Sequence, residues 1–359
     1  MLKSLFKRPY HVLNQIVISQ SALKENLQTF REQNPGVEVS VVLKSNAYGH
    51  GLKEVGRILD GEKCPYFVVD SLYEAYALRK AGVRTPLLVL GYQNPNNLRK
   101  GMPFTFTAYD LASLKTLIDK KLPFHLEVDT GMHRMGLSPE ELPRALTLLK
   151  QAPHLCTGFF SHLMTADSPD ENRLRAQERV FVEALTLLRA EGLSPLWIHL
   201  GNSAGTPKLH IPELNMARLG IGLYGGIEGF RPALHVESTL VAVRDLNAGE
   251  ALSYGATFIA DKEMTVGVIP FGYYEGLPIA LSNVGSVRYK DHDCPIVGRV
   301  NMNHTFLDVT GLEARVGDPA SFYTSEGASS VMTLAEQAKT ISYELLVRLS
   351  SSIRRIVRP

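Results

Sequence analysis

VEVSVVLKSNAYGHG, residues 37–51, begins as a short apolar strand and ends in a polar, glycine-rich loop, with Lys44 at the junction. The valine-rich part, residues 37–44, has the composition of a buried strand. Apolar runs of this kind recur up to about residue 222, and helix-like stretches separate several of them, most clearly over residues 170–190. Strands that alternate with helices predict parallel strands joined by crossover helices.

Eight such runs can be counted before residue 222. They cover residues 37–44, 66–71, 86–91, 104–109, 124–130, 155–163, 196–203 and 214–220. Eight parallel strands predict a closed (β/α)8 barrel of the TIM type. An open doubly wound sheet is the alternative architecture, but no glycine-rich phosphate turn opens a helix after the first strands.

After about Pro232 the pattern changes to strand-like runs separated by Gly, Asn and Asp turns. These runs cover residues 235–243, 265–273, 286–290, 294–300 and 305–310. A final helix is predicted from residue 333 onward, because apolar residues recur there at near-helical spacing. The sequence therefore predicts two domains, a barrel over residues 1–232 and a mainly β domain over residues 233–359.

The 359 residues carry 38 basic and 36 acidic side chains, which gives a net charge of +2. These charges are dispersed, so we expect neither nucleic acid nor a membrane as a partner, but small molecules or a second copy of the chain. The three cysteines are far apart and form no CxxC pair, which fits a reducing cytoplasm. Residues 1–13 lack the apolar run of a signal segment, and no run reaches the length of a membrane helix.

In a (β/α)8 barrel the active site lies at the carboxyl ends of the strands, and these ends are unusually polar here. The loops after strands seven and eight are the usual phosphate site of this fold, and they offer Ser203, Gly220 and Ile221 as donors. A lysine amine opposite a phosphate site is what pyridoxal phosphate (PLP) requires, because these groups hold its two ends. The other polar residues at strand ends are Lys44, Arg134, His162, Asn202 and Arg218.

Two other kinds of site are not supported. Residues 220–225 match GxGxxG, but no helix pattern follows them, which argues against a dinucleotide site. The histidines show no HxH or HExxH spacing, so no catalytic metal is expected.

Seven motifs in the chain resemble those of the alanine racemases, and the resemblance extends in order over residues 41–343. The motifs are VVLKSNAYGHG, VDTGMHRMG, HLGNSAGT, ARLGIGLYG, SYGATF, IPFGYYEG and GRVNMN. The resemblance implies a PLP-dependent racemase that interconverts L- and D-alanine and supplies D-alanine for peptidoglycan.

By this resemblance Lys44 carries the cofactor through a Schiff base, His162 packs beside the pyridine ring and Arg218 faces the ring nitrogen. A guanidinium does not give up its proton, so Arg218 would donate a hydrogen bond without protonating the ring. That would weaken the cofactor as an electron sink and limit side reactions such as transamination. The other cofactor-binding residues that the resemblance implies are Tyr48, Asn202, Ser203, Gly220, Ile221 and Tyr343.

The resemblance also implies two catalytic bases, because racemisation removes a proton from one face of Cα and returns it to the other. Lys44 is one base, and Tyr254 in the β domain is the other. Tyr254 and Met302 would enter the active site of the partner in a head-to-tail homodimer. Arg134 would bind the cofactor's phenolic oxygen and the substrate carboxylate, and Tyr273 would narrow the entrance in favour of small side chains.

Three residues depart from the family pattern. Glu127 stands where a carbamylated lysine is often found, and its carboxylate would orient Arg134 directly, so activity should not depend on carbon dioxide. Asn303 stands where an aspartate is common, and Glu275 replaces an aspartate near the entrance. These last two leave the substrate range open, since serine or a broader set of amino acids would use the same catalytic groups.

Two other functions remain open. An amino-acid decarboxylase of the same two-domain type would use the same lysine and phosphate loops, but it favours an acidic partner for the pyridine nitrogen and needs no tyrosine base. A non-catalytic PLP carrier is usually a barrel alone, and the long segment after Pro232 argues against it.

Overall fold

The structure, a computed structural model, describes residues 11–359. Residues 1–10 lie outside the described part of the chain. The prediction that residues 1–13 form no signal segment therefore falls mostly on residues that are not described. The described chain forms two compact units. The first consists of Lys24–Ala47 and Val55–Leu223, and the second contains Tyr48–Glu54, Tyr224–Pro359 and the chain before Lys24.

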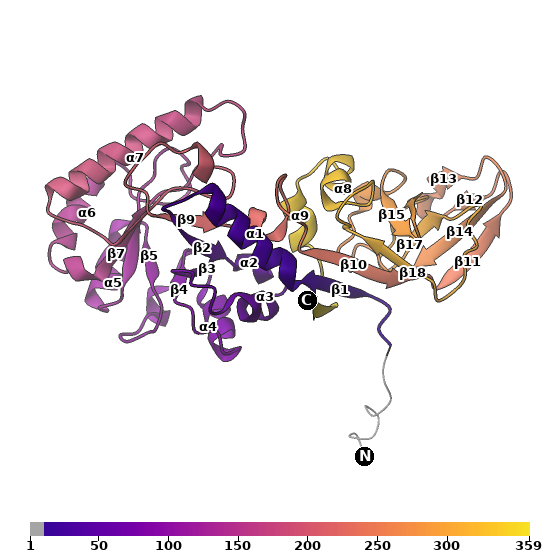
Figure 1. Ribbon diagram of the computed structural model, residues 1–359, viewed down its shortest axis with the longest axis horizontal. Helices are drawn as coiled ribbons and strands as arrows, with labels where there is room; N and C mark the ends of the chain where they lie inside the picture. The colour runs from indigo at the N-terminus through magenta and orange to yellow at the C-terminus, as the bar shows by residue number, and fades with distance from the viewer. Residues whose placement is uncertain (1–10) are drawn as a thin grey trace, which may run out of the picture. The chain divides into compact units, whose positions relative to one another are not determined.

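The first unit is a barrel of parallel strands, which hydrogen-bond in the orders β4-β3-β2-β9 and β5-β6-β7-β8 (Figure 1). Two backbone hydrogen bonds join the two sets of strands into a closed ring. Val89 N donates to Thr105 O (2.9 Å), and Asn215 N donates to Ile198 O (3.1 Å). The predicted (β/α)8 barrel is therefore confirmed. The strands are β2 (Glu38–Val42), β3 (Phe67–Val69), β4 (Leu87–Val89), β5 (Phe106–Ala108), β6 (Phe124–Glu127), β7 (Cys156–Phe160), β8 (Trp197–His199) and β9 (Met216–Leu219).

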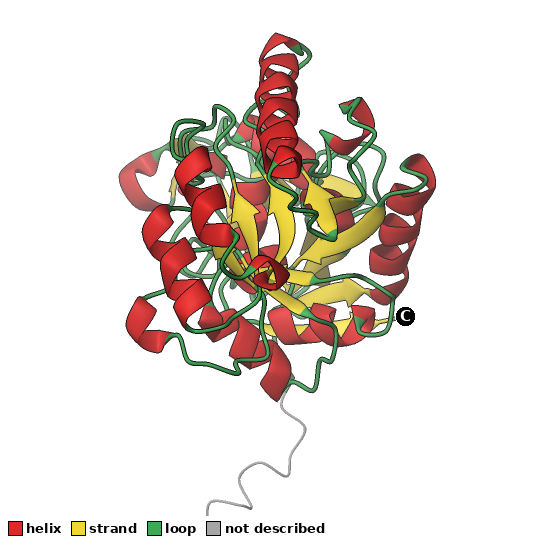
Figure 2. Cartoon of the chain, turned by 90° about the vertical axis from the view of Figure 1, so that its left-hand side faces the viewer, coloured by secondary structure: helices red, strands yellow, loops and turns green. Residues whose placement is uncertain are grey.

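Helices follow the barrel strands along the chain and surround them in space (Figure 2). The helix predicted over residues 170–190 is confirmed as α7 (Asn172–Ala190), and its apolar stripe, including Leu174, Phe181 and Leu188, is buried. Within the described residues no helix combines the length and apolar character needed to cross a membrane. The other helices are α1 (Gln20–Gln33), α2 (Lys44–Tyr48), α3 (Leu52–Leu59), α4 (Leu72–Lys80), α5 (Leu111–Asp119) and α6 (Leu142–Leu149).

The second unit is built mainly from β-sheets, with strand orders β16-β15-β18-β10-β1-β19, β11-β14-β17 and β12-β13. The first strand of the chain belongs here, since Ile16 of β1 lies opposite Val236 of β10. Neither β1 nor β19 is among the predicted strands, and the domain boundary expected after residue 232 stays a prediction. The strands are β1 (Gln15–Ser19), β10 (Leu234–Thr239), β11 (Ala242–Leu246), β12 (Ala251–Leu252), β13 (Phe258–Ile259), β14 (Met264–Ile269), β15 (Ser286–Tyr289), β16 (His292–Pro295), β17 (Thr305–Asp308), β18 (Pro319–Phe322) and β19 (Arg354–Arg358).

The prediction of a single final helix from residue 333 was wrong. The structure has two short helices, α8 (Val331–Gln337) and α9 (Ser342–Val347), and the chain then ends in β19. Lys339 adopts a φ of 54°, in the left-handed region that ends a right-handed helix. The apolar spacing therefore continues past the point where the first of the two helices ends.

Candidate active site

Lys44 follows β2 and opens a turn of unusual backbone conformation. Ser45, Asn46 and Ala47 have φ angles of 56°, 56° and 52°, which lie in the left-handed region. Each such residue costs about 1–2 kcal/mol, because its Cβ approaches the following carbonyl oxygen. Ala47 N donates to Leu43 O (2.8 Å) and closes the turn. Backbone strain of this kind clusters at functional sites, and here it lies directly beside the predicted catalytic lysine.

The buried carboxylate of Glu74 holds this turn in place. Its Oε1 accepts from Ser45 N (2.7 Å), and its Oε2 accepts from Asp70 N (2.9 Å) and Ser71 N (3.3 Å). Ser71 and Glu74 also form the capping box at the start of α4. Glu74 is not among the predicted site residues, although the Ser-x-x-Glu spacing of residues 71–74 is a signal for it.

Arg218 lies in β9 and is only 2% exposed. Its Nη2 donates to the carbonyl oxygens of Ser161 (2.8 Å) and Leu200 (3.2 Å), and its Nη1 donates to His199 Nδ1. Its Nε has no hydrogen-bond acceptor among residues 11–359. Burial lowers the pKa of Arg218 to about 10, against the opposing charge of Glu127, so the guanidinium is charged at neutral pH. The Nε–H of a buried cation is thus available to a ligand.

Two buried histidines, His199 and His125, continue the contacts of Arg218. A guanidinium only donates, so His199 accepts at Nδ1 and carries its proton on Nε2. That proton goes to His125 Nδ1, 2.8 Å away, and the proton of His125 therefore lies on Nε2, which has no partner among residues 11–359. Burial and then the charge of Arg218 lower the pKa of His125 to about 3 and that of His199 well below its usual value, so both rings are neutral. Neither ring is among the predicted site residues, because only the folded barrel brings them together.

His162 follows β7 and contacts the other terminal nitrogen of Arg218, with Nδ1 lying 3.2 Å from Nη2. Burial, followed by the charges of Arg218, Arg134 and Lys44, lowers the pKa of His162 to about 3, so the ring is neutral at physiological pH. Because the guanidinium donates to Nδ1, the neutral ring carries its proton on Nε2. His162 Nε2 is therefore a hydrogen-bond donor.

Glu127 is the last residue of β6 and is 5% exposed. Burial raises the pKa of its carboxyl to about 7, against the positive charges of Arg218 and Arg134. In the part of the chain that the structure describes, no hydrogen bond or ion pair joins Glu127 to Arg134, whose side chain is exposed. Within residues 11–359 the structure therefore shows no bond by which Glu127 would orient Arg134 directly, contrary to what the sequence led us to expect, and the two side chains act on each other through their charges.

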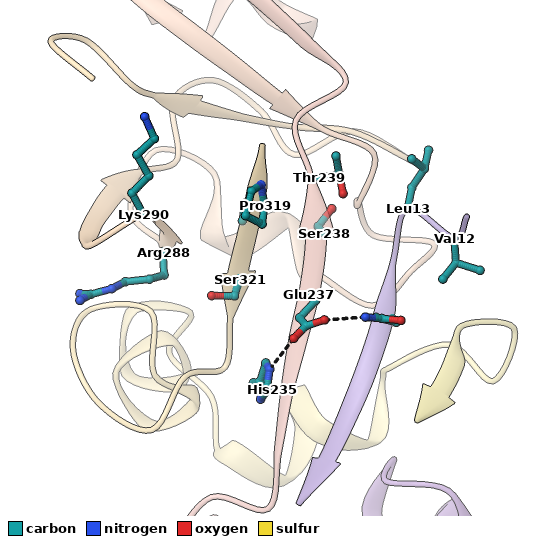
Figure 3. A pocket seen from close by; sticks show the side chains of 12 residues that line it. Val12, Leu13, His235, Glu237, Ser238, Thr239, Arg288, Lys290, Pro319 and Ser321 are labelled. Atoms are coloured by element: carbon teal, nitrogen blue, oxygen red, sulfur yellow. Dashed lines mark hydrogen bonds and ion pairs between the residues drawn. The ribbon is translucent and has the colours of Figure 1, made fainter. Parts of the chain in front are cut away.

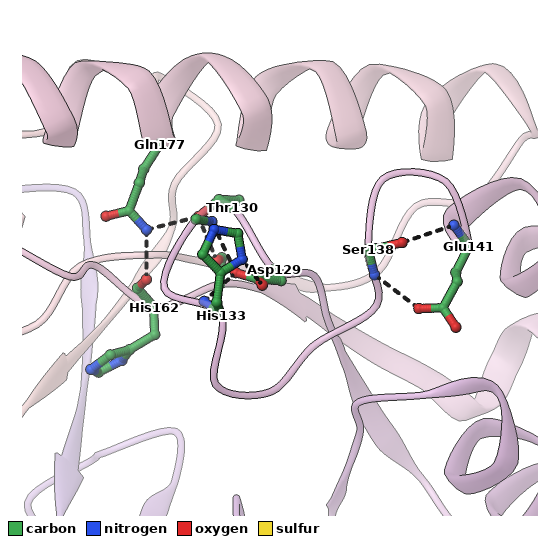
Figure 4. A network of polar contacts seen from close by, with 9 residues as sticks. Asp129, Thr130, His133, Ser138, Glu141, His162 and Gln177 are labelled. Carbon is green, nitrogen blue, oxygen red and sulfur yellow. Dashed lines mark hydrogen bonds and ion pairs between the residues drawn. The ribbon is translucent and has the colours of Figure 1, made fainter.

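The loop after β6, residues 129–136, is held by a polar network (Figure 4). Asp129 Oδ1 accepts from two backbone N–H groups of the loop, at 2.9 and 3.1 Å, and so shapes its turn. Gln177 of α7 donates from Nε2 to Thr130 Oγ1 (3.1 Å) and to the carbonyl oxygen of His162 (3.0 Å). These bonds tie the loop that carries the predicted substrate arginine to the segment after β7.

Ser203, after β8, is hydrogen-bonded to the turn after β9. Ser203 Oγ accepts from Gly220 N (3.0 Å) and Gly222 N (3.2 Å), which leaves its own proton to donate. Asn202 Oδ1 accepts from a backbone N–H of the adjoining turn (2.9 Å). The helical turn η5 (Ile221–Tyr224) begins directly after Gly220. The structure thus brings together the predicted phosphate residues of the barrel unit.

Three tyrosines of the second unit, Tyr48, Tyr224 and Tyr343, pack together. The rings of Tyr48 and Tyr224 are stacked 4.9 Å apart, and the centres of Tyr48 and Tyr343 are 6.0 Å apart. Burial, followed by Tyr343, raises the pKa of Tyr48, so its hydroxyl stays protonated and can donate. Tyr48 and Tyr343, both predicted to bind phosphate, therefore belong to one cluster, while their convergence with Ser203 stays a prediction.

Tyr254, Tyr273 and Met302 lie on three connected loops of the second unit. They are 70%, 43% and 54% exposed. Tyr273 N donates to Asn301 O (3.0 Å), and Ser253 Oγ lies 3.0 Å from Asn301 Oδ1, so the residue before Met302 joins all three loops. The unit therefore presents the predicted base and both predicted entrance residues on its surface.

A separate hollow of about 380 Å³ lies on the six-stranded sheet of the second unit (Figure 3). The carboxylate of Glu237 lines this hollow. It accepts hydrogen bonds from Gln15 Nε2 (2.5 Å) and Arg358 Nη1 (2.7 Å) and lies 3.1 Å from His235 Nε2. The lining, which falls within residues 12–321, contains no predicted site residue. We therefore give this hollow no catalytic role.

The cysteines and the candidate metal ligands add no further site. Cys64, Cys156 and Cys294 are free and buried. Within residues 11–359, no three His, Cys, Asp or Glu side chains are grouped so that they could hold a metal ion. The expected absence of a catalytic metal stays a prediction.

Two family profiles together match almost the whole chain. "Alanine racemase, N-terminal domain" matches residues 18–228, and "Alanine racemase, C-terminal domain" matches residues 233–357. With the barrel and the lysine at its strand ends, these matches define a racemase built from a barrel and a β domain. The chain belongs to the alanine racemase family.

Known proteins agree with this assignment over nearly their full length. "Alanine racemase 2" of Bacillus subtilis is 33% identical over 369 aligned positions, which cover 95% of this chain and 93% of that protein. The structure of alanine racemase from E. faecalis has a TM-score of 0.87 at 29% identity and covers 97% of this chain and 99% of its own. The structure of alanine racemase from Bacillus anthracis with bound L-Ala-P has a TM-score of 0.88 at 27% identity. The match covers 98% of this chain and 96% of that one.

Proposed function

We propose that this protein is a PLP-dependent alanine racemase that interconverts L- and D-alanine. The observation that carries the proposal is the donor set of Arg218. Each terminal nitrogen of this buried guanidinium has at least one protein acceptor, whereas Nε has none among the described residues. Such a donor suits a ring nitrogen that accepts a hydrogen bond and stays unprotonated. Membership of the alanine racemase family supports the same activity.

The residues present fit PLP. Lys44 would hold the aldehyde carbon, Arg218 Nε the pyridine nitrogen and the Ser203 hydroxyl the phosphate, with His162 beside the ring. When bound, PLP withdraws electrons from the substrate Cα and makes the proton there removable. Further phosphate and cofactor contacts would come from Tyr48, Asn202, Gly220, Ile221 and Tyr343.

Two bases would then move the Cα proton. Lys44 would serve one face of the substrate, and Tyr254 of the partner subunit the other. The 70% exposure of Tyr254 supports a role outside its own unit. His162 Nε2, as a donor, would stabilise the negative oxygen that forms on this tyrosine when it gives up its proton.

Substrate selection and assembly follow from the same residues. Arg134 would bind the substrate carboxylate, and Tyr273 and Met302 would narrow the entrance of the partner's site in a head-to-tail homodimer. The exposure of both entrance residues supports this arrangement. We place the reaction in the cytoplasm, where the three free cysteines stay reduced and D-alanine is needed for peptidoglycan.

The test uses the purified protein with PLP and L-alanine in deuterated water. We expect an absorbance band of lysine-bound cofactor, loss of optical rotation and incorporation of deuterium at Cα. Lys44→Ala should abolish all three, while Lys53→Ala, which removes an exposed lysine of α3, should change none of them. A protein that binds the cofactor but leaves alanine unchanged would contradict the proposed substrate. Release of carbon dioxide from an amino acid would instead indicate a decarboxylase.

A further inference from the structure

Asn303 and Glu275, which both depart from the family pattern, are bonded to each other in the second unit. Asn303 Nδ2 donates to Glu275 Oε1 (2.8 Å). The other carboxylate oxygen, Oε2, accepts from Gly272 N (2.9 Å). A carboxylate only accepts, so the amide of Asn303 must present its nitrogen. The two departures therefore form one complementary pair.

This side-chain bond connects the two loops that carry the predicted entrance residues. Tyr273 lies on the loop of residues 270–277, and Met302 lies on the loop of residues 298–304. The backbones are also in close contact, since Tyr273 N donates to Asn301 O (3.0 Å). A Cβ added at Gly272 would stand only 2.2 Å from that same oxygen. The position of either loop therefore depends on the other.

Glu275 is fixed from its other side as well. Its backbone oxygen accepts from Ser350 N (3.0 Å). The next residue, Gly276, has a φ of +119°, and a Cβ there would lie 2.7 Å from Arg348 O. The carboxylate consequently has little room to withdraw if the group opposite it changes.

We propose that the bond between Asn303 and Glu275 positions Tyr273 and Met302, and thereby sets the size of the amino-acid side chain that the enzyme accepts. The inference rests on the proposed function, in which these two residues narrow the entrance of the partner's site. Both members of the pair are positioning residues, since neither needs to touch the substrate.

Exchanging the two functional groups tests the pair. Asn303→Asp places two carboxylates in contact, and their repulsion should force the loops apart. Glu275→Gln should be mild, because the Asn303 amide can rotate and present its oxygen to the new amide. The double variant restores a donor and an acceptor, since the new amide at residue 275 donates to the new carboxylate and still accepts from Gly272 N.

We expect Asn303→Asp to raise KM for alanine about tenfold with kcat changed less than about threefold, and to lower the preference for alanine over serine by a similar factor. Glu275→Gln and the double variant should stay within about threefold of the wild type. Asn96→Asp adds the same charge at an exposed position of the barrel unit and should change neither constant.

Two outcomes would overturn the inference: an unchanged KM and preference in Asn303→Asp, or a double variant as impaired as Asn303→Asp. Thermal unfolding of the wild type and the three variants provides a readout that needs no activity. The double exchange should recover the melting temperature that Asn303→Asp loses, and additive losses would also overturn the pairing. A wild type that racemises no amino acid would instead contradict the proposed function, and the unfolding data would still decide whether the two residues are coupled.

Discussion

His199 accepts a hydrogen bond from Arg218 Nη1 at its Nδ1, and this contact fixes the proton positions of two buried rings. The donor-only guanidinium requires that His199 donate in turn to His125. With Nη2 bonded to Ser161 O and Leu200 O, the guanidinium plane has one orientation. The histidine pair therefore helps to orient the Nε–H of Arg218.

Replacing His199 tests this arrangement. His199→Gln keeps an acceptor for Arg218 and a donor for His125, whereas His199→Leu leaves a buried N–H and a buried ring nitrogen unpaired. We expect the leucine variant to lose about 2–4 kcal/mol of unfolding free energy and the glutamine variant about 1 kcal/mol or less. Urea titration measures both. Equal losses in the two variants would contradict the assigned proton positions.

The pKa of Glu127 predicts how stability depends on pH. Burial raises this pKa to about 7, so between pH 4.5 and 7 the folded chain holds a proton that the unfolded chain has lost. The contribution of the protonated Glu127 carboxyl to the free energy of unfolding is therefore fully present below the pKa of the unfolded state. It is lost as pH rises through 7. Glu127→Gln should remove this loss and stabilise the chain at pH 8 by up to ~3 kcal/mol. Unfolding free energies at pH 5 and pH 8 measure the effect, and an equal change at both would contradict it.

The barrel could be predicted because its strands are buried on both faces and appear as runs of Val, Leu and Phe. Lys44 could be found because it ends such a run. The pairing of His125 with His199 could not, since the two lie 74 positions apart and no local spacing joins them. The strand β1 carries a local signal in the run Ile16–Ile18, but its place in the second unit could not be predicted, because its partner β10 is distant in sequence. The end of α8 near Lys339 depends on the backbone conformation there, which the spacing of apolar residues does not reveal.

Arg218 should control which reaction the cofactor performs. In Arg218→Glu the new carboxyl can share a proton with the ring nitrogen, which strengthens electron withdrawal and favours transamination. We expect pyruvate to form from alanine in this variant while racemisation falls. Arg218→Lys keeps the positive charge and should form none. Absence of pyruvate from a folded Arg218→Glu variant, with folding checked by circular dichroism, would count against this role.

Activity should not depend on carbon dioxide. Glu127 supplies a carboxyl group at the end of β6 without any modification, so no carbamate has to form. Racemisation rates should agree in degassed buffer and in buffer with added bicarbonate at the same pH. A rate that falls on degassing and recovers with bicarbonate would show that another lysine is modified.

His162 should influence the partner's base rather than titrate itself. Its pKa of about 3 keeps the ring neutral, so no change in rate above pH 5 can come from its own protonation. As a donor at Nε2 it would stabilise the phenolate of Tyr254, and a free tyrosine has a pKa near 10. In His162→Ala we expect the ascending limb of the pH–rate profile to shift upward by about one pH unit and kcat at pH 7 to fall about tenfold. His162→Gln keeps a donor and should recover part of both. A profile that is unchanged in His162→Ala would contradict this role of His162.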